Sequence, residues 1–487
     1  MKRGDNHEMG LRKIHRKPIS LLWLIPFILA TLACGATVNL PQARLVFGRL
    51  PATATVTAIT TSTATPIPTT ATPTPTVSFT ATPAFKSTTT LGPAFTPVEP
   101  TVRIANQVLQ INVFTQLWTT IRDNYLYADF NGLDWNAIFE EYHDKIIAGM
   151  RNEDFYQAMD EMIGRLGDEH SIYFSPEQVF EEDARFSGQL DYVGIGVLTI
   201  SVPERSRITI IQVFPGSPAE AAGLQIHDSI LAVDGEPILD ENGDRLAMLR
   251  GPIGSDISIT VLSPGQGPRQ VKVERNRIDS ELPVYSQVFT SPEGKRIGYI
   301  QLTTFDDETI PRKVRRALQS LASGGRLHGL ILDNRYNEGG ANTVFENVLA
   351  YFKGGRLGFF VDRSGDKEAL SVEGRNISGS QQVPLVVLVG KDTASFGEIF
   401  SGILKDTQRA YLIGQTTDGN VEILYAYEFT DGSRAWIAHD RFQPLNHPEQ
   451  DWEESGIIPN QTVTSNWDEV TEDTDPLIKA ALEHFDQ

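Results

Sequence analysis

The stretch Val389-Gly390-Lys391-Asp392-Thr393-Ala394-Ser395-Phe396-Gly397-Glu398-Ile399-Phe400 ends an apolar run that begins at residue 385. It predicts a buried strand that passes through a turn into a helix. Ser395 then stands at the helix amino terminus, where the helix dipole and the free N–H groups favour a developing negative charge. By itself, such a serine fits a helix cap as well as it fits a nucleophile.

A second strand exit of the same kind lies upstream, in residues 332–340, Leu-Asp-Asn-Arg-Tyr-Asn-Glu-Gly-Gly. The chain leaves a buried strand through Gly339 and Gly340, and a helix is expected to start near Asn342. Backbone N–H groups exposed at such a turn can stabilise an oxyanion, provided that a nucleophile lies nearby.

Short apolar strands alternate with helical stretches from about residue 290 to residue 487. This pattern predicts an α/β core domain. The strands are expected at residues 297–302, 330–333, 385–389 and 411–413. The Asp431-Gly432 turn adds a hairpin between residues 423–429 and 434–438.

Residues 188–278 alternate strand-like runs with turns, and three of their segments are distinctive. These are residues 192–197 (Tyr-Val-Gly-Ile-Gly-Val), 213–224 (Val-Phe-Pro-Gly-Ser-Pro-Ala-Glu-Ala-Ala-Gly-Leu) and 228–235 (Asp-Ser-Ile-Leu-Ala-Val-Asp-Gly). Together they resemble a PDZ domain, a family that binds a peptide as an added strand and holds its terminal carboxylate on backbone N–H groups. The resemblance places the carboxylate loop at Val193, Gly194, Ile195 and Gly196. The alternative is a β-rich scaffold without a ligand.

Residues 102–180 predict a helical domain. Phe114, Leu117, Trp118 and Ile121 have the i, i+3, i+4, i+7 spacing of one buried helix face, and further helical runs follow at residues 135–150 and 155–166. The segment closes in a turn-like sequence that carries His170.

The first 101 residues do not predict a fold. Residues 1–34 combine a basic start with a short apolar run, which is typical of an export signal. The run ends in Thr31-Leu32-Ala33-Cys34-Gly35, which resembles the lipobox of bacterial lipoproteins except that the leucine is one position late. That resemblance implies lipidation of Cys34; the alternatives are cleavage elsewhere or a retained anchor helix. Residues 35–101 predict an extended Thr/Pro-rich stalk.

Composition excludes several function classes. The chain of 487 residues carries a net charge of −20, and because residues 1–100 are basic, the remainder is more negative still. This acidic part of the chain is a poor partner for nucleic acid, because cationic side chains drive the binding of nucleic acids. The single cysteine, Cys34, excludes a disulfide or a Cys-based site in the body. No ligand cluster or phosphate loop is evident, so neither a metal nor another cofactor is expected.

The order of the segments after residue 100 resembles the tail-specific, or carboxyl-terminal processing, serine proteases. Their nucleophile motif reads roughly Ser-Ala-Ser-Ala-Ser-Glu-Ile, and residues 393–399 here read Thr-Ala-Ser-Phe-Gly-Glu-Ile. The resemblance implies a ClpP/crotonase-like α/β core with an inserted PDZ domain and an amino-terminal helical domain. It makes Ser395 the nucleophile and implies an oxyanion hole from Gly339, Gly340 and the N–H of Phe396.

The chain departs from that family at the general base. The family has a lysine about 25 residues beyond the serine, whereas this chain has Asn420, and an amide cannot take the proton. The related tricorn-type proteases use a His near the end of the helical segment, assisted by a Glu. His170 and Glu453 match those positions, and a histidine pKa suits the task.

Two alternatives remain open at this point. Another base, His439 or Lys405, could serve Ser395. Catalysis could also be lost, which would leave a peptide-binding lipoprotein in which Ser395 caps a helix. We expect an exported, membrane-tethered serine endopeptidase of unfolded or carboxyl-terminal peptide, held outside the cytoplasmic membrane or in the periplasm, that cleaves through an acyl-enzyme on Ser395.

Overall fold

The computed structural model describes residues 100–487 except 169, 189–190, 241–246 and 280. The expected signal, Cys34 and nearly all of the stalk lie outside the described residues. Among the helices that the structure describes, none is long and apolar enough to cross a membrane.

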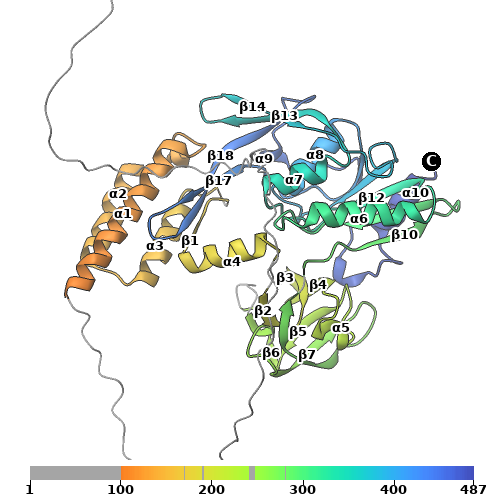
Figure 1. Cartoon of the computed structure of the whole chain (residues 1–487), viewed down its shortest axis with the longest axis horizontal. Helices are drawn as coiled ribbons and strands as arrows, with labels where there is room; N and C mark the ends of the chain where they lie inside the picture. The colour runs from red at the N-terminus through yellow and green to blue at the C-terminus, as the bar shows by residue number, and fades with distance from the viewer. Residues whose placement is uncertain (1–99, 169, 189–190, 241–246, 280) are drawn as a thin grey trace, which may run out of the picture. The chain divides into compact units, whose positions relative to one another are not determined.

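The amino-terminal segment is helical, as expected. Its elements are α1 (Pro100–Asn124), α2 (Trp135–Ala148), α3 (Asn152–Gly164), β1 (Ile172–Phe174) and α4 (Pro176–Phe186). Phe114, Leu117 and Ile121 are fully buried and Trp118 is partly buried against the same core, which confirms the predicted face of α1. Helices α1, α2 and α3 lie side by side (Figure 1).

An antiparallel sheet joins this helical segment to the core domain. Its strands are β1, β13 (Gly355–Asp362), β14 (Lys367–Val372), β17 (Ile423–Glu428) and β18 (Arg434–Pro444). Strands β17 and β18 form the expected antiparallel hairpin, and β1 adds to β18. The helices share one hydrophobic core with this hairpin, through Tyr427, Phe429 and Ile437. The turn that carries His170 is therefore attached directly to the core domain.

The core domain is built on a six-stranded sheet in the order β10-β11-β12-β15-β16-β19. The strands are β10 (Ser286–Thr290), β11 (Arg296–Gln301), β12 (Gly329–Asp333), β15 (Leu385–Val389), β16 (Tyr411–Gly414) and β19 (Gln461–Thr462). Strands β11, β12, β15, β16 and β19 run parallel. All four strands expected from the sequence are present.

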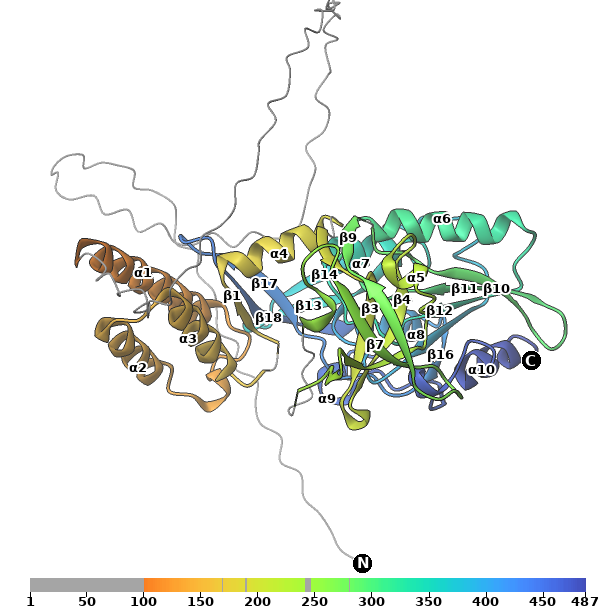
Figure 2. The same cartoon turned by 90° about the horizontal axis from the view of Figure 1, so that it is seen from below.

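Helices cover both faces of this sheet. They are α6 (Ile310–Ser323), α7 (Asn342–Leu349), α8 (Phe396–Asp406) and α10 (Pro476–His484). Successive side chains of a strand point to opposite faces of the sheet. In β15, Val387 packs with α6, α7 and α8, whereas Val386 and Leu388 pack with α10. Figure 2 shows α6 and α10 on opposite sides of the parallel strands.

The PDZ segment has a hydrophobic core of its own. A sheet in the order β3-β4-β5-β7-β8, with β6 beside β5, is accompanied by the pair β2–β9 and the short helix α5. The bounds are β2 (Asp191–Gly194), β3 (Val197–Val202), β4 (Arg207–Val213), α5 (Pro218–Ala221), β5 (Ser229–Val233), β6 (Glu236–Pro237), β7 (Asp256–Leu262), β8 (Arg269–Glu274) and β9 (Asn276–Asp279). Strand β3, which follows the predicted carboxylate loop, is an edge strand.

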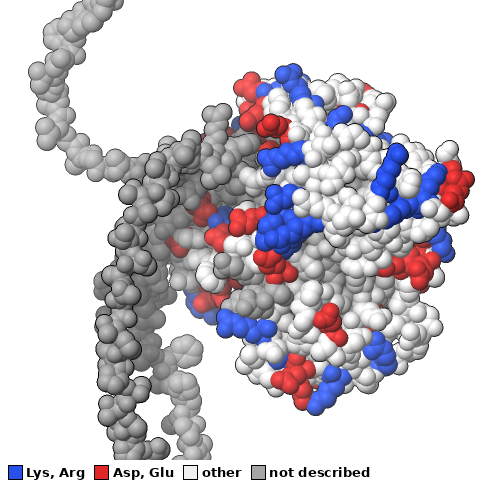
Figure 3. Space-filling model, turned by 45° about the vertical axis from the view of Figure 1, so that its right-hand side comes forward, with Lys and Arg blue, Asp and Glu red and all other residues white. Residues whose placement is uncertain are grey.

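Hydrogen bonds and an ion pair join the PDZ segment to the core domain. Trp467 donates from Nε1 to the Ile210 carbonyl, its own carbonyl accepts from Nδ1 of His227, and Arg205 pairs with Asp468 at 3.0 Å. On the face drawn in Figure 3, acidic and basic side chains are interspersed, and no extended basic surface of the kind that binds nucleic acid is visible there.

Candidate active site

Ser395 stands where the sequence predicts, between β15 and α8, and its backbone is unusual. Its φ of 51° and ψ of −130° lie in a region that residues other than glycine rarely adopt, and such a conformation costs on the order of 1–3 kcal/mol. Although Ser395 occupies the N-cap position of α8, its side chain makes no cap hydrogen bond. The residue is therefore not a conventional helix cap.

The two strand exits meet because β12 and β15 are parallel neighbours whose carboxyl ends share one sheet edge. A Cβ added to Gly339 would lie 2.7 Å from Cβ and 3.0 Å from Oγ of Ser395, so only glycine fits there with its φ of +91°. The Gly-Gly turn thus lies directly against the serine hydroxyl.

The N–H groups of this turn are not equivalent. Gly339 donates its N–H to Oδ1 of Asn337 at 3.0 Å, so this group is already engaged. The N–H groups of Gly340 and Phe396 donate to no acceptor in the described part of the chain. Phe396 opens α8, so the helix dipole adds to its N–H. These two groups are the candidates for binding an oxyanion.

Asn420, in the position of the family lysine, touches the serine through its backbone. Its carbonyl accepts from the Ser395 N–H at 2.6 Å, and its own N–H donates to Oε2 of Glu398 at 2.7 Å. Glu398 is fully buried in α8 and also accepts from the Gly419 N–H and the Thr417 hydroxyl. A buried carboxylate thus fixes this loop against the nucleophile, but the side-chain amide of Asn420 is not a proton acceptor suited to general-base catalysis.

His170 and Glu453 are brought together from positions 283 residues apart. His170 Nε2 lies 2.9 Å from Oε1 of Glu453, and the Val421 N–H donates to Oε2 of the same carboxylate at 2.6 Å. Because a carboxylate only accepts, Nε2 carries the proton and Nδ1 keeps the free lone pair. This Nδ1 is buried and has no hydrogen-bond partner among the described residues.

The backbone around His170 is held by a polar turn. Oδ1 of Asp168 accepts from the N–H groups of His170 and Ser171, and the Ser171 hydroxyl accepts from the Ala438 N–H on β18. Burial alone would lower the pKa of His170. The hydrogen bond and charge of Glu453, together with Glu422 and Asp168, outweigh burial and raise this pKa above its ordinary value.

Glu422 was not expected from the sequence, and it lies beside the His–Glu pair. Its Oε2 is 3.9 Å from Nε2 of His170, and the Tyr127 hydroxyl donates to its Oε1. Only 2% of its side chain is exposed. Burial raises the pKa of Glu422 to about 7, and the neighbouring charge of Glu453 contributes in the same direction.

The two other bases considered from the sequence lie elsewhere. Lys405 is in the last turn of α8, roughly 15 Å from Ser395 along a helix that rises about 1.5 Å per residue, and its Nζ donates to the Ile458 carbonyl. His439 bonds to Asp440 through Nδ1 at 2.6 Å and stacks on Tyr425. Neither residue lines the cavity that contains Ser395, whereas His170 does.

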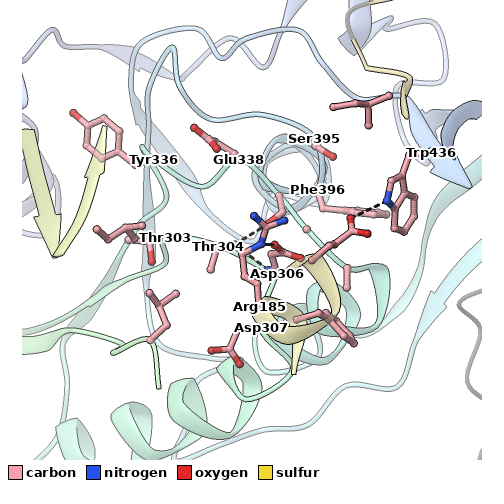
Figure 4. A pocket seen from close by; sticks show the side chains of 18 of the residues that line it. Arg185, Thr303, Thr304, Asp306, Asp307, Tyr336, Glu338, Ser395, Phe396 and Trp436 are labelled. Atoms are coloured by element: carbon pink, nitrogen blue, oxygen red, sulfur yellow. Dashed lines mark hydrogen bonds and ion pairs between the residues drawn. The ribbon is translucent and has the colours of Figure 1, made fainter. Parts of the chain in front are cut away.

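That cavity has a volume of about 1410 Å³ and reaches the PDZ segment. Its wall includes Ser395, Phe396, Gly340 and His170 on the core side, and Ile195, Gly196 and the edge strand β3 on the PDZ side. Figure 4 shows Ser395 and Phe396 in the wall, together with the ion pair of Arg185 and Asp306. Of the four residues predicted for the carboxylate loop, Val193 and Gly194 belong to β2, while Ile195 and Gly196 face the cavity.

Comparisons with known proteins agree with this architecture. Residues 296–463 match peptidase family S41, residues 112–164 match the Tricorn protease C1 domain, and residues 209–263 match a PDZ domain. The carboxyl-terminal-processing protease of Synechocystis is 33% identical over 76% of this chain and 85% of its own length. The corresponding protease of Picosynechococcus is 31% identical over 81% and 92%.

A solved structure supports the same assignment. A photosystem II D1 C-terminal processing protease superposes with a TM-score of 0.51 at 26% identity, over 73% of this chain and 92% of that one. The chain therefore belongs to the carboxyl-terminal processing proteases, serine peptidases of the S41 family that carry a PDZ domain.

Proposed function

We propose that the chain is an endopeptidase in which Ser395, His170 and Glu453 form the catalytic triad. The observation that carries the proposal is the 2.9 Å pair of His170 and Glu453, in which His170 lines the same cavity as the uncapped Ser395. A carboxylate on Nε2 fixes the tautomer in which Nδ1 can accept a proton. His170 thereby takes over the task of the lysine that Asn420 replaces.

In this mechanism Nδ1 of His170 takes the proton of Ser395 as Oγ bonds to the scissile carbonyl carbon. The oxyanion accepts hydrogen bonds from the N–H groups of Gly340 and Phe396. The charge of Glu453 stabilises the imidazolium, which then protonates the leaving amine, and water hydrolyses the acyl-enzyme. No hydrogen bond joins Ser395 to His170 among the described contacts, and such bonds commonly tighten only with substrate.

The PDZ segment is proposed to deliver the substrate. Its edge strand β3 offers a site for strand addition, and the cavity runs from β3 and Gly196 to Ser395. An unfolded or carboxyl-terminal peptide bound along β3 would enter the cavity that contains the nucleophile. The substrate is therefore a peptide segment that can become extended.

Labelling with a serine-reactive phosphonate tests this function against the alternative of a binding-only protein. We expect one covalent adduct per chain, located on Ser395 by peptide mass spectrometry, because the reagent requires an activated hydroxyl. Denatured chain is the control and should not react. Absence of the adduct from folded chain would support peptide binding without catalysis.

We also propose that the protein is exported and tethered through a lipidated Cys34. Support comes from the sequence alone, in the signal-like residues 1–34 and the stalk that follows. Replacement of Cys34 by serine should move the protein from the membrane fraction to the soluble extracytoplasmic fraction, because the lipid anchor is lost. An unchanged distribution would contradict lipidation at this residue.

A further inference from the structure

Three ligand-type side chains, one of them that of His170, converge from positions far apart in the chain. Nε2 of His170, a carboxylate oxygen of Glu422 and one of Glu453 all lie within 4.8 Å of one another. Two of the separations, 2.9 Å and 3.9 Å, bracket the distance of about 3.3 Å between neighbouring ligands of a tetrahedral ion bound at about 2.0–2.1 Å. These separations are compatible with all three atoms binding one small cation.

The unsatisfied oxygen of Glu422 is a second observation that points to a ligand. Its Oε1 accepts from Tyr127, but its Oε2 is buried and has no hydrogen-bond partner among the described residues. At 3.9 Å from Nε2 of His170, Oε2 is too far for a hydrogen bond. A buried carboxylate oxygen without a partner destabilises the folded chain unless a cation binds to it.

A second cavity gives access to these three residues. It has a volume of about 450 Å³, and four carboxylates line it, those of Asp168, Asp418, Glu422 and Glu453. Neither lysine nor arginine is among its described lining residues. The negative lining concentrates cations at the opening and disfavours anions.

We propose that His170, Glu422 and Glu453 bind one divalent transition-metal ion of the Zn²⁺ type, and that the bound ion switches the peptidase off. The regulatory half of this proposal, inhibition by the bound ion, rests on the proposed function. The imidazole ligand selects an ion such as Zn²⁺, since Mg²⁺ and Ca²⁺ prefer six or more oxygen ligands.

Inhibition follows because metal binding uses Nε2 of His170 and catalysis uses Nδ1 of the same ring. The metal needs the lone pair of Nε2, so it binds the neutral ring only as the other tautomer, in which the single ring proton has moved through solvent from Nε2 to Nδ1. A protonated Nδ1 cannot accept the proton of Ser395. Glu453 also turns from orienting the histidine to binding the ion. Metal binding and catalysis therefore exclude each other, without any redox step.

Calorimetric titration of the full Ser395→Ala chain with ZnCl₂, in excess Mg²⁺, measures binding independently of turnover. We expect one site per chain, a dissociation constant at least tenfold higher in Glu422→Gln and in Glu453→Gln, and loss of the site in His170→Ala. His447→Ala is the matched control and should bind as before, because His447 pairs at 2.6 Å with the single carboxylate of Asp406. Absence of saturable binding, or binding that survives all three substitutions, would overturn the site.

Inhibition is measured separately on the wild-type chain. We expect Zn²⁺ at saturation to lower cleavage of an unfolded protein at least tenfold, and EDTA to restore it. An active enzyme that binds Zn²⁺ at this site without inhibition would overturn the regulatory half. A chain that binds Zn²⁺ but cleaves nothing would support the metal site and contradict the proposed function.

Discussion

Replacing Ser395 by alanine is expected to abolish cleavage of an unfolded protein substrate, lowering kcat by a factor on the order of 10⁴ or more. The hydroxyl lies against the Gly-Gly turn, and its side chain supports no helix cap whose loss would unfold α8. The assay compares the rate of product formation by gel or by mass spectrometry at equal chain concentration.

A matched serine separates the chemistry from the fold. Ser320 is exposed on α6, so Ser320→Ala should keep the wild-type rate, and both variants should keep the wild-type unfolding temperature. Cleavage at the wild-type rate by Ser395→Ala would show that the nucleophile lies elsewhere.

The sequence predicts the positions of the chemistry well where local pattern decides them. The apolar runs that became β12 and β15 are short and bounded by turn residues, so the strand exits that carry Gly339 and Ser395 could be located. Their adjacency follows from the parallel order of the sheet, which a single sequence does not show. The resemblance to a known family supplied that link.

Glu422 shows what local pattern cannot reveal. It lies just before β17 in an ordinary strand-like sequence, and its role depends on Tyr127, 295 residues away, and on His170. Gly339 is a local case: its N–H donates to the side chain of Asn337, two residues away, through a turn geometry that the motif alone does not specify. Three-dimensional contacts, rather than motifs, determine which polar groups remain without a hydrogen-bond partner.

The departure at Asn420 is understandable once the loop is seen in three dimensions. Glu398 and Glu453 fix the loop by accepting hydrogen bonds from the N–H groups of Asn420 and Val421, respectively. Glu453 thus holds the loop and the histidine at once. With His170 proposed as the base, a lysine is not needed at this position, and the loop still positions Ser395 through its backbone.

Replacing His170 by alanine should lower kcat as strongly as the loss of Ser395, because no other histidine and no lysine is among the described residues that line the cavity. His439→Ala is the matched control and should retain most activity, since His439 is already bonded to Asp440 and lies outside the cavity. Equal loss of activity in both variants would contradict the assignment of His170 as the base.

The pH profile of kcat/KM gives an independent readout of the same histidine. The base must be neutral to accept the serine proton, and the charges around it raise the pKa of His170 above its ordinary value of about 6.5. The rate should therefore fall as pH drops through a pKa above 6.5, with one proton taken up. In Glu453→Gln the charge that raises this pKa is removed while the side chain keeps its size, so the acid limb should move to lower pH as the rate falls. A profile that is flat between pH 5 and pH 8 would exclude histidine as the base.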